Sequence, residues 1–517
     1  MGKKQSQTLR NHVLGLPTQT MNKKASNTRR IISNASGKSG YVLTYGHFST
    51  IHPGHIRYLK HAKGLGEKLA VAVIGDKSKI RYPYTQKERV EALKLLGIAD
   101  KIILMKGDDL GDAIKDIKPK ILVLGNEYKQ RDDLDKVLKS FIENGGSLQF
   151  HAGDIHYATS DLLGSSESAL NKRRIQIFKA ACDRQGLSKE SLIKSMNNWV
   201  STKLIVLGDT IVDQYAACEA IGMSAEAPVV VVRELQKQSF IGGAAIVAAH
   251  IRSLGAQCDL ISVVGDDETA GLVKDQLKEL NIGNSLVVDG TRPTTFKKRN
   301  VVENQKLFRV SRLEEQNIDK STEDLMIKRL HELAPMTNGI VISDFVYGVV
   351  TPNILNEVQI VAKKHNLMLF GDLQCSSQVG AVTKFKEFAL LCPNEREARL
   401  AMQDKDSGLE KLSKNLIEST QTNKLVMKLG SEGFIAYDQL SDGEYLSQAF
   451  PALSVNPVDV AGAGDSLLAV FATGLASGEN MMLTAAIACC MAAQAVETMG
   501  NKPIGCKALQ KFIDDVL

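Results

Sequence analysis

The sequence predicts two α/β domains in a chain of 517 residues. Three observations support this fold class. Short β-rich runs alternate with amphipathic stretches on both sides of residues 164–200, a Ser-rich and then basic segment. The chain is longer than most chains that fold around a single hydrophobic core, so more than one domain is expected. Hydrophobic residues make up 44% and charged residues 24%, which is typical of a globular protein and excludes a collagen-like or membrane-embedded one.

The first domain is expected at residues 40–163. Amphipathic helices are predicted at Gln86–Leu96 and Arg131–Ile142. Helical crossovers between short strands predict a parallel sheet. The predicted strands are Tyr41–Tyr45, Leu69–Ile74, Lys101–Met105, Lys120–Leu124 and Ser147–His151.

The second domain is expected at residues 201–517, after a linker and leading helix at 164–200. It opens with the buried-strand patterns Leu204–Leu207 and Val229–Val232 and closes with Ala-rich helices. The eight cysteines are scattered without metal-ligand spacing, so we expect reduced core residues.

Residues 1–39 carry eight Lys/Arg and no Asp or Glu, so the rest of the chain is nearly neutral. A basic, polar segment without apolar periodicity predicts a disordered tail. Two alternatives stay open: an organelle transit peptide, and an N-myristoylation signal in Met1–Ser6. The neutral body argues against nucleic-acid binding. Without a secretory signal or an apolar run that spans a bilayer, we expect a cytoplasmic protein.

The first candidate site follows the strand Tyr41–Tyr45, in the stretch from Gly46 to His55. His52 and His55 flank a glycine at a strand-to-helix turn, where helix N–H groups are unpaired. Two imidazoles there can bind a phosphate that gains charge during nucleotidyl transfer.

Residues 40–163 resemble the cytidylyltransferase-like nucleotidyltransferases. The resemblance rests on His52-Pro53-Gly54-His55, on Arg81 with Glu88-Arg89, and on Thr159-Ser160-Asp161. It implies a Rossmann-like fold and transfer of a nucleoside monophosphate from ATP or CTP to a phosphate acceptor. His52 and His55 would then stabilise the pentavalent phosphorus. The implied nucleotide and phosphate ligands are Gly46, Phe48, Arg89, Thr159 and Ser160.

Two positions depart from that family's pattern. Ser49 stands where the family usually has Asp, and Leu124 stands where a Lys is common. An alternative therefore keeps this domain as a non-catalytic nucleotide-binding or scaffold module.

The second candidate site is Asp459–Asp465, followed by the apolar helical run Ser466–Leu475. A Gly-Ala-Gly turn at a helix start presents successive N–H groups to an anion. Asp465 in the same turn can take the proton of an attacking hydroxyl while a γ-phosphoryl group is transferred. The anion-binding positions are Ala461, Gly462, Ala463 and Gly464.

Residues 200–505 resemble the ribokinase-like sugar kinases, with Gly208-Asp209, Gly265-Asp266-Asp267 and Asn394-x-x-Glu397 in place. The resemblance implies that Asp465 is the catalytic base and that Asn394 and Glu397 organise Mg²⁺ through water. The implied sugar ligands are Asp213, Gly242 and Gly243, and Lys428 and Gly430 lie on the ATP side.

Within that group, the chain resembles the bifunctional heptose-7-phosphate kinase/heptose-1-phosphate nucleotidyltransferases, in which the kinase usually comes first. The resemblance lies in Ser224–Val229, in Lys298-Arg299 with Arg309, and in Ser343-Asp344-Phe345. Lys298, Arg299 and Arg309 are candidate phosphate clamps, with exposed salt bridges as the plainer alternative. Tyr347 stands where that family tends to have Lys.

These resemblances imply a bifunctional enzyme of nucleotide-activated sugar synthesis. The kinase would phosphorylate the anomeric hydroxyl of a sugar phosphate, with heptose 7-phosphate expected. The transferase would then make an NDP-sugar, with ADP-heptose of lipopolysaccharide synthesis expected. The expected partners are sugar phosphates and nucleoside triphosphates, with a homodimer by analogy. A riboflavin kinase/FAD synthetase shares this domain order but lacks Gly-Ala-Gly-Asp in its kinase.

Overall fold

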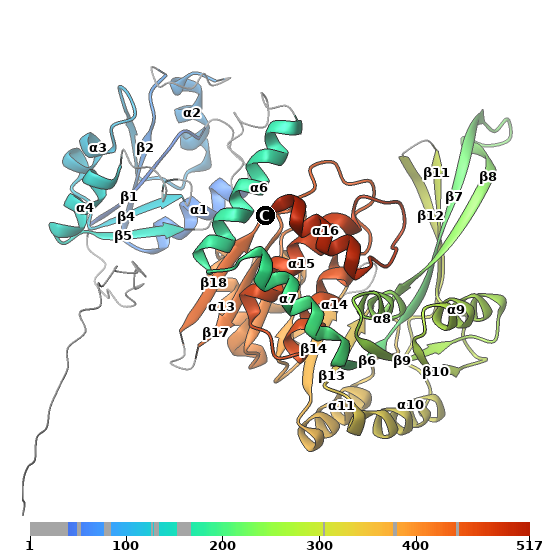
Figure 1. Cartoon of the computed structure of the whole chain (residues 1–517). Coiled ribbons are helices and arrows are strands. Elements are labelled where there is room, and N and C mark those ends of the chain that lie inside the picture. Colours follow the sequence, from blue (N-terminus) through green and yellow to red (C-terminus); the bar gives the residue numbers. More distant parts are fainter. Residues whose placement is uncertain are drawn as a thin grey trace, which may run out of the picture. The chain divides into compact units, whose positions relative to one another are not determined.

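The computed structural model describes residues 40–48, 53–76, 84–125, 128, 134–151, 167–302, 305–375, 380–440 and 444–517. The predicted tail at 1–39 lies outside these ranges. Two α/β regions follow one another along the chain (Figure 1). They confirm the predicted fold class.

The first region is a five-stranded parallel sheet with the strand order β3-β2-β1-β4-β5. All five strands were predicted to within a residue or two. Their bounds are β1 Tyr41–Gly46, β2 Lys68–Val73, β3 Lys101–Leu104, β4 Ile121–Gly125 and β5 Ser147–His151. The helices of this region are α1 Pro53–Gly64, α2 Gln86–Leu96, α3 Leu110–Ile117 and α4 Asp135–Glu143.

Both faces of this sheet are buried, because side chains alternate along each strand. Val42 on one face packs with α1 and α2, whereas Leu43 on the other packs with α3 and α4. The helices end in ways that the sequence dictates. Thr85 and Glu88 form a capping box at the start of α2, and Gly97 ends it in the left-handed conformation.

The second region contains a nine-stranded sheet with the order β10-β9-β6-β13-β14-β15-β16-β17-β18. The strands are parallel up to β16, and the last two are antiparallel. Their bounds are β6 Lys203–Gly208, β9 Gln257–Val264, β10 Gly283–Val288, β13 Gly339–Asp344, β14 Met368–Leu373, β15 Leu390–Leu391, β16 Lys424–Lys428, β17 Phe434–Gln439 and β18 Tyr445–Phe450.

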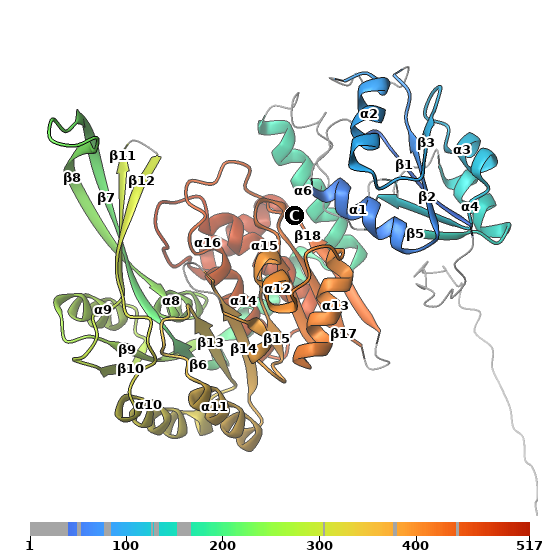
Figure 2. The ribbon, with the colours of Figure 1, turned by 180° about the vertical axis from the view of Figure 1, so that it is seen from behind.

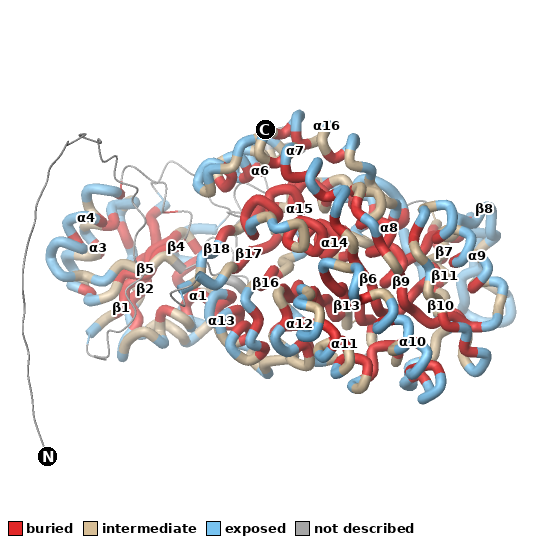
Figure 3. The backbone as a smooth tube through the Cα atoms, turned by 60° about the horizontal axis from the view of Figure 1, so that its bottom comes forward, coloured by how far each residue is buried: buried red, intermediate tan, exposed pale blue. Residues whose placement is uncertain are grey.

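Helices cover both faces of this sheet, and the buried backbone runs through its centre (Figure 3). The first face packs against α8 Ala244–Ser253, α9 Glu268–Glu279, α14 Ala463–Ala476, α15 Met481–Ala495 and α16 Cys506–Val516. The second face packs against α10 Lys320–Leu333, α11 Pro352–His365, α12 Glu395–Met402 and α13 Leu409–Thr420. No helix in the described ranges has the length and apolar character of a membrane span.

A separate four-stranded sheet extends from the helix-covered layers (Figure 2). Its order is β12-β11-β7-β8, with bounds β7 Thr210–Met223, β8 Val230–Gly243, β11 Phe296–Val302 and β12 Gln305–Arg312. The far half of β7 and β8 is mostly exposed, whereas the ends near Thr210 and Gly243 are buried. This sheet therefore places its buried end beside the main sheet.

Two helices lie in the segment 164–200, where a linker and a leading helix were expected. They are α6 Glu167–Arg184 and α7 Lys189–Asn198. Phe178, Met196 and Trp199 are fully or almost fully buried in the core of the second region. The ring of Phe178 lies 6.4 Å from that of Phe450 on β18. These residues therefore belong to the core of the second region.

Candidate active sites

The Asp459–Asp465 turn leads directly into α14. Gly462 is the N-cap of this helix and has a φ of +86°, a conformation that favours glycine. A Cβ at Gly462 would lie 2.1 Å from the side chain of Asn501, so only glycine fits here. Asp465 follows in the first turn, where backbone N–H groups lack intrahelical partners.

The Asp465 carboxylate is held by two amide side chains. Gln374 donates to Oδ1 at 2.8 Å, and Asn501 donates to Oδ2 at 3.2 Å. Burial, together with the nearby carboxylate of Asp372, raises the pKa of Asp465 to about 7. A carboxylate with this pKa is well matched to proton abstraction near neutral pH.

Lys428 lies beside this carboxylate at the end of β16. Its Nζ bonds both oxygens of Asp372 at 2.8 Å. A Cβ at Gly464 would lie 3.4 Å from the same Nζ. Burial opposes the charge of Lys428, but Asp372 and Glu397 raise its pKa above the ordinary value. A cation is thus fixed next to the glycine-rich turn.

Asn394 and Glu397 form a capping box at the start of α12. The Glu397 N–H donates to Asn394 Oδ1, and the Asn394 N–H donates to Glu397 Oε2, both at 2.8 Å. Cys375 N–H donates to Glu397 Oε1 at 3.2 Å. Burial, with the repulsion of Asp372, raises the pKa of Glu397. These contacts fix Glu397 and leave further lone pairs on each oxygen for water.

A cavity of about 680 Å³ brings three predicted ATP-side residues together. Asn394, Lys428 and Gly430 line it, with Arg396 and Arg399 of α12. Gly430 has a φ of +60°. The cavity thus combines cations with the capped start of a helix, as an anionic ligand requires.

The predicted sugar ligands meet at the buried end of the four-stranded sheet. A Cβ at Gly242 would lie 2.8 Å from Asp213 Oδ2, and one at Gly243 would lie 2.1 Å from the Asp209 carbonyl oxygen. Gly243 also has a φ of +60°. Gly242 therefore lets the chain before α8 approach Asp213 closely, and Gly243 lets it approach the backbone of Asp209.

One face of β11 and β12 is basic. Arg299 forms an ion pair with Asp213 and lies directly opposite Arg309 in the strand register. Lys297 is two residues before Arg299, so both point to the same face. Lys297 is 4% exposed, and its Nζ lies 5.4 and 4.9 Å from the ring centroids of Phe345 and Tyr347.

Lys298 was expected to bind phosphate together with Arg299 and Arg309. Strand alternation instead puts Lys298 on the opposite face of the sheet. Its ammonium group pairs there with Glu234 of β8. The sequence analysis missed Lys297. Strand register could have identified Lys297 as a candidate. In the parallel pair of β11 and β7, Lys297 lies opposite Asp213 and Arg299 lies opposite Tyr215, so Lys297 is on the same face as Arg299.

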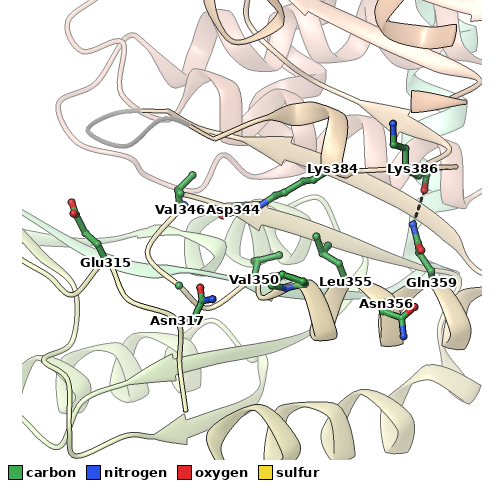
Figure 4. Close-up of a pocket in the computed structure, with 12 residues that line it drawn as sticks. Glu315, Asn317, Asp344, Val346, Val350, Leu355, Asn356, Gln359, Lys384 and Lys386 are labelled. Atoms are coloured by element: carbon green, nitrogen blue, oxygen red, sulfur yellow. Dashed lines mark hydrogen bonds and ion pairs between the residues drawn. The ribbon is translucent and has the colours of Figure 1, made fainter. Parts of the chain in front are cut away.

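Asp209 fixes the loop that carries Tyr347 through hydrogen bonds to the backbone of the loop. This buried carboxylate accepts N–H bonds from Phe345 at 2.7 Å, Val349 at 3.4 Å and Tyr347 at 3.5 Å. On its other side the loop borders a cavity of about 450 Å³ (Figure 4). Figure 4 shows Lys384 reaching toward Asp344, with which it forms an ion pair.

The first region places Gly46, Phe48 and His55 at the end of β1. The ring of Phe48 lies 5.3 Å from that of His55, which is in the first turn of α1. A Cβ at Gly46 would lie 3.2 Å from the Phe48 ring. The structure therefore brings these three predicted residues together. His52, Thr159, Ser160, Arg81 and Ser49 lie outside the described residues.

Arg89 was expected to bind phosphate, but its guanidinium is bonded to groups of the protein itself. Its side chain is buried, and its guanidinium donates to the carbonyl oxygens of His47, Ile74 and Tyr84. It also pairs with Asp76 at 2.8 Å. These bonds join the loop after β1 to the loop after β2. Leu124 is fully buried in the core and supplies no charge.

Comparisons with known proteins agree with this geometry. Residues 201–504 match the model of the pfkB family carbohydrate kinases, and residues 43–150 match the cytidylyltransferase-like model. The transferase-like domain thus precedes the kinase domain, the reverse of the order expected for the bifunctional family.

Curated relatives are about a third identical to this chain over the part that aligns. The bifunctional protein HldE of Campylobacter jejuni is 33% identical over 60% of this chain and 64% of its own length. The protein of the same name from Geobacter sulfurreducens is 31% identical over 58% of this chain and 60% of its own length. The chain therefore spans less than two thirds of these relatives.

Solved structures support the fold of the second region. Phosphofructokinase-2 from Escherichia coli, in complex with substrates and products, aligns with a TM-score of 0.50 and 16% identity. The alignment covers 61% of this chain and 99% of that chain. Because the family model covers more than half of the sequence, the chain belongs to the pfkB family of carbohydrate kinases.

Proposed function

We propose that the C-terminal domain transfers the γ-phosphoryl group of ATP to the anomeric hydroxyl of a sugar phosphate. The observation that carries this proposal is Asp465, a buried carboxylate with a raised pKa in the first turn of α14. It lies beside Lys428 and the glycine-rich turn. This arrangement combines a proton acceptor with donors for a transferring phosphoryl group.

In this step Asp465 accepts the proton of the anomeric hydroxyl as its oxygen bonds to the γ-phosphorus. The bond from that phosphorus to the bridging oxygen breaks, and ADP leaves. Gln374 and Asn501 stabilise the charged form of the carboxylate and leave further lone pairs for the substrate hydroxyl. The N–H groups around Gly462–Gly464 and the Lys428 ammonium would stabilise the charge on the phosphoryl oxygens.

The phosphate already present on the sugar would lie on the basic face of β11 and β12. Arg299 and Arg309 keep their predicted role, and Lys297 joins them in place of Lys298. Lys297 is held by two aromatic rings and has no carboxylate bonded to it in the described structure. Its charge is therefore available to a ligand anion.

The residues on the ATP side fit Mg²⁺ held through water. Glu397 is an oxygen donor fixed by backbone N–H groups, and Asn394 adds an amide oxygen. When bound, Mg²⁺ would neutralise charge on the triphosphate.

We propose that the N-terminal domain joins the resulting sugar 1-phosphate to a nucleoside monophosphate from ATP or CTP, with release of pyrophosphate. The positions of Gly46, Phe48 and His55 support it. In this proposal Arg89 holds the loops around the site, because its donors are used by backbone oxygens and Asp76.

The alternative is a nucleotide-binding or scaffold module without transferase activity. The buried, uncharged Leu124 and the engaged guanidinium of Arg89 favour it, since both remove a cation expected near phosphate. A pyrophosphate-release assay with sugar 1-phosphates distinguishes an active transferase from a non-catalytic module. Release that requires His52 and His55 supports the transferase, and no release with any sugar 1-phosphate supports the module.

We propose heptose 7-phosphate as the first acceptor and ADP-heptose as the final product. The resemblance to the bifunctional heptose enzymes and the relatives named HldE support this choice. A phosphatase must act between the two steps, because the distal phosphate has to be removed. Mass spectrometry of products from a panel of sugar phosphates with ATP and CTP tests the assignment. The cytoplasmic location and the homodimer remain predictions.

A further inference from the structure

A buried histidine is linked to the proposed catalytic base through a single amide. His250 lies on α8 and is fully buried. Its Nε2 is 3.2 Å from Asn501 Oδ1, and Asn501 Nδ2 is 3.2 Å from Asp465 Oδ2. The three residues come from segments far apart in the sequence.

The chemistry of these groups permits one arrangement of protons when Asp465 is ionised. A carboxylate only accepts hydrogen bonds, so Asn501 must present its NH₂ group to Asp465. The Asn501 carbonyl oxygen then faces His250, and Nε2 of the imidazole must carry a proton. Burial lowers the pKa of His250 to about 4, so the ring is neutral at pH 7.

Asn501 also supports the turn that carries the anion-binding glycines. Its side chain occupies the space next to Gly462 that a Cβ would need. The neighbouring Gly500 N–H donates to Asp459 Oδ2 at 3.4 Å, at the beginning of the same turn. His250 belongs to α8, whose N-cap is Gly243, on the sugar side. The link therefore joins the sugar-side helix to the phosphoryl-side turn.

We propose that His250 and Asn501 are positioning residues that hold Asp465 in its proton-accepting orientation. His250 fixes which end of the Asn501 amide faces the carboxylate, and Asn501 fixes the carboxylate. The proposal rests on the assignment of Asp465 as the base of the proposed kinase reaction. The other charged groups that act on Asp465 are Asp372 of β14, Lys428 of β16 and Asp213 of β7.

The test compares His250→Phe, which keeps a ring but loses the donor, with His250→Gln, which keeps an N–H donor. ADP release is measured with ATP and heptose 7-phosphate. We expect His250→Phe to lower kcat about tenfold, the effect of losing one buried hydrogen bond, with the KM for ATP within about twofold. His250→Gln should recover most of this loss. His331→Phe is the matched control, because His331 is exposed and pairs with Glu357.

A pH profile separates positioning from a structural role. Asn501→Leu removes a donor to the ionised carboxylate, so the acidic limb of the kcat profile should move to higher pH. Equal kcat values for His250→Phe and His250→Gln, or an unmoved acidic limb, would overturn the proposal. If Asp465→Asn retained turnover, the assignment of the base itself would fail instead.

A measurement on the unmutated chain covers the case in which His250→Phe does not fold. ¹⁵N NMR of the imidazoles, with His250 assigned from the His250→Gln spectrum, should show a neutral Nε2–H ring at about pH 8, where Asp465 is ionised. A protonated ring or the Nδ1–H tautomer at that pH would contradict the link.

Discussion

The ammonium nitrogen of Lys297 lies 4.9 Å from the ring centroid of Tyr347, on a loop tied to the end of β6 by Asp209. Tyr347 occupies a position where the bifunctional heptose enzymes tend to have Lys. In this structure the Lys297 ammonium group reaches the Tyr347 ring from the neighbouring sheet, and the ring orients it.

Lys297→Met should raise the KM for the sugar phosphate about tenfold or more, since a charged contact with the phosphate is lost. The KM for ATP should change little. Lys298→Met is the control, because the ion pair of Lys298 with Glu234 on the opposite face is partly exposed and of small energetic weight. Steady-state kinetics with both substrates decides. Equal effects of the two substitutions would refute the role of Lys297.

Asp465→Asn should make the protein more stable above pH 7 while it removes activity. Burial raises the pKa of Asp465 to about 7, so below pH 7 the folded carboxyl keeps a proton that the unfolded chain has lost. Stability of the unmutated protein therefore falls between about pH 4 and pH 7, and Asn avoids this loss. One pKa unit is about 1.4 kcal/mol, which makes the expected gain at pH 8 on the order of a few kcal/mol. Thermal denaturation of Asp465→Asn and of the unmutated protein at pH 4 and pH 8 measures this gain. An equal Tm difference between the two proteins at both pH values would contradict the raised pKa of the buried Asp465 carboxyl.

The parallel strands were predictable because each is a short apolar run between helical patterns. Ser147–His151 and Gln86–Leu96 have the bounds expected from the sequence. The long strand β8 was not predicted beyond its first residues, because the middle of the strand, Arg233–Ser239, is mostly polar and leaves no apolar pattern. Its existence depends on pairing with β7.

In the candidate sites, too, features set by the local sequence were predictable, and contacts between distant segments were not. Asp465 and the glycines before it could be named as candidates because a local turn carries their chemistry. Gln374 and Asn501 were missed, since their contact with Asp465 joins positions 91 and 36 residues apart. Lys298 was named and Lys297 was not considered, because the face on which each side chain lies depends on strand register, which the sequence does not display.

Arg89→Met should destabilise the N-terminal domain by more than about 2 kcal/mol, because the carbonyl oxygens of His47, Ile74 and Tyr84, of which that of Ile74 is buried, lose their donor. Hydrogen exchange of β1 and β2 measures the loss. The single tryptophan, Trp199, is buried in the C-terminal core, so its fluorescence transition serves as an internal control and should not move. Unchanged exchange with weaker nucleotide binding would instead support the original role of Arg89 as a phosphate ligand.

The pair His52→Ala with His55→Ala should abolish pyrophosphate release and leave kinase turnover near normal. The two imidazoles are proposed to stabilise charge that grows in the transition state, so the loss should be at least about 10²–10³-fold. Parallel assays of pyrophosphate and ADP release measure both activities. Loss of kinase turnover in a folded double mutant would show that the N-terminal module regulates the kinase.

The most direct test of the account is to identify the product that the chain forms from ATP and heptose 7-phosphate. ³¹P NMR of the reaction should show a second sugar phosphate at the anomeric position, formed in step with ADP. With Asp465→Asn the rate should fall about 10²–10⁴-fold, as expected when a general base is lost. Phosphorylation at another hydroxyl, or turnover of Asp465→Asn within about threefold of the unmutated protein, would contradict the central claim.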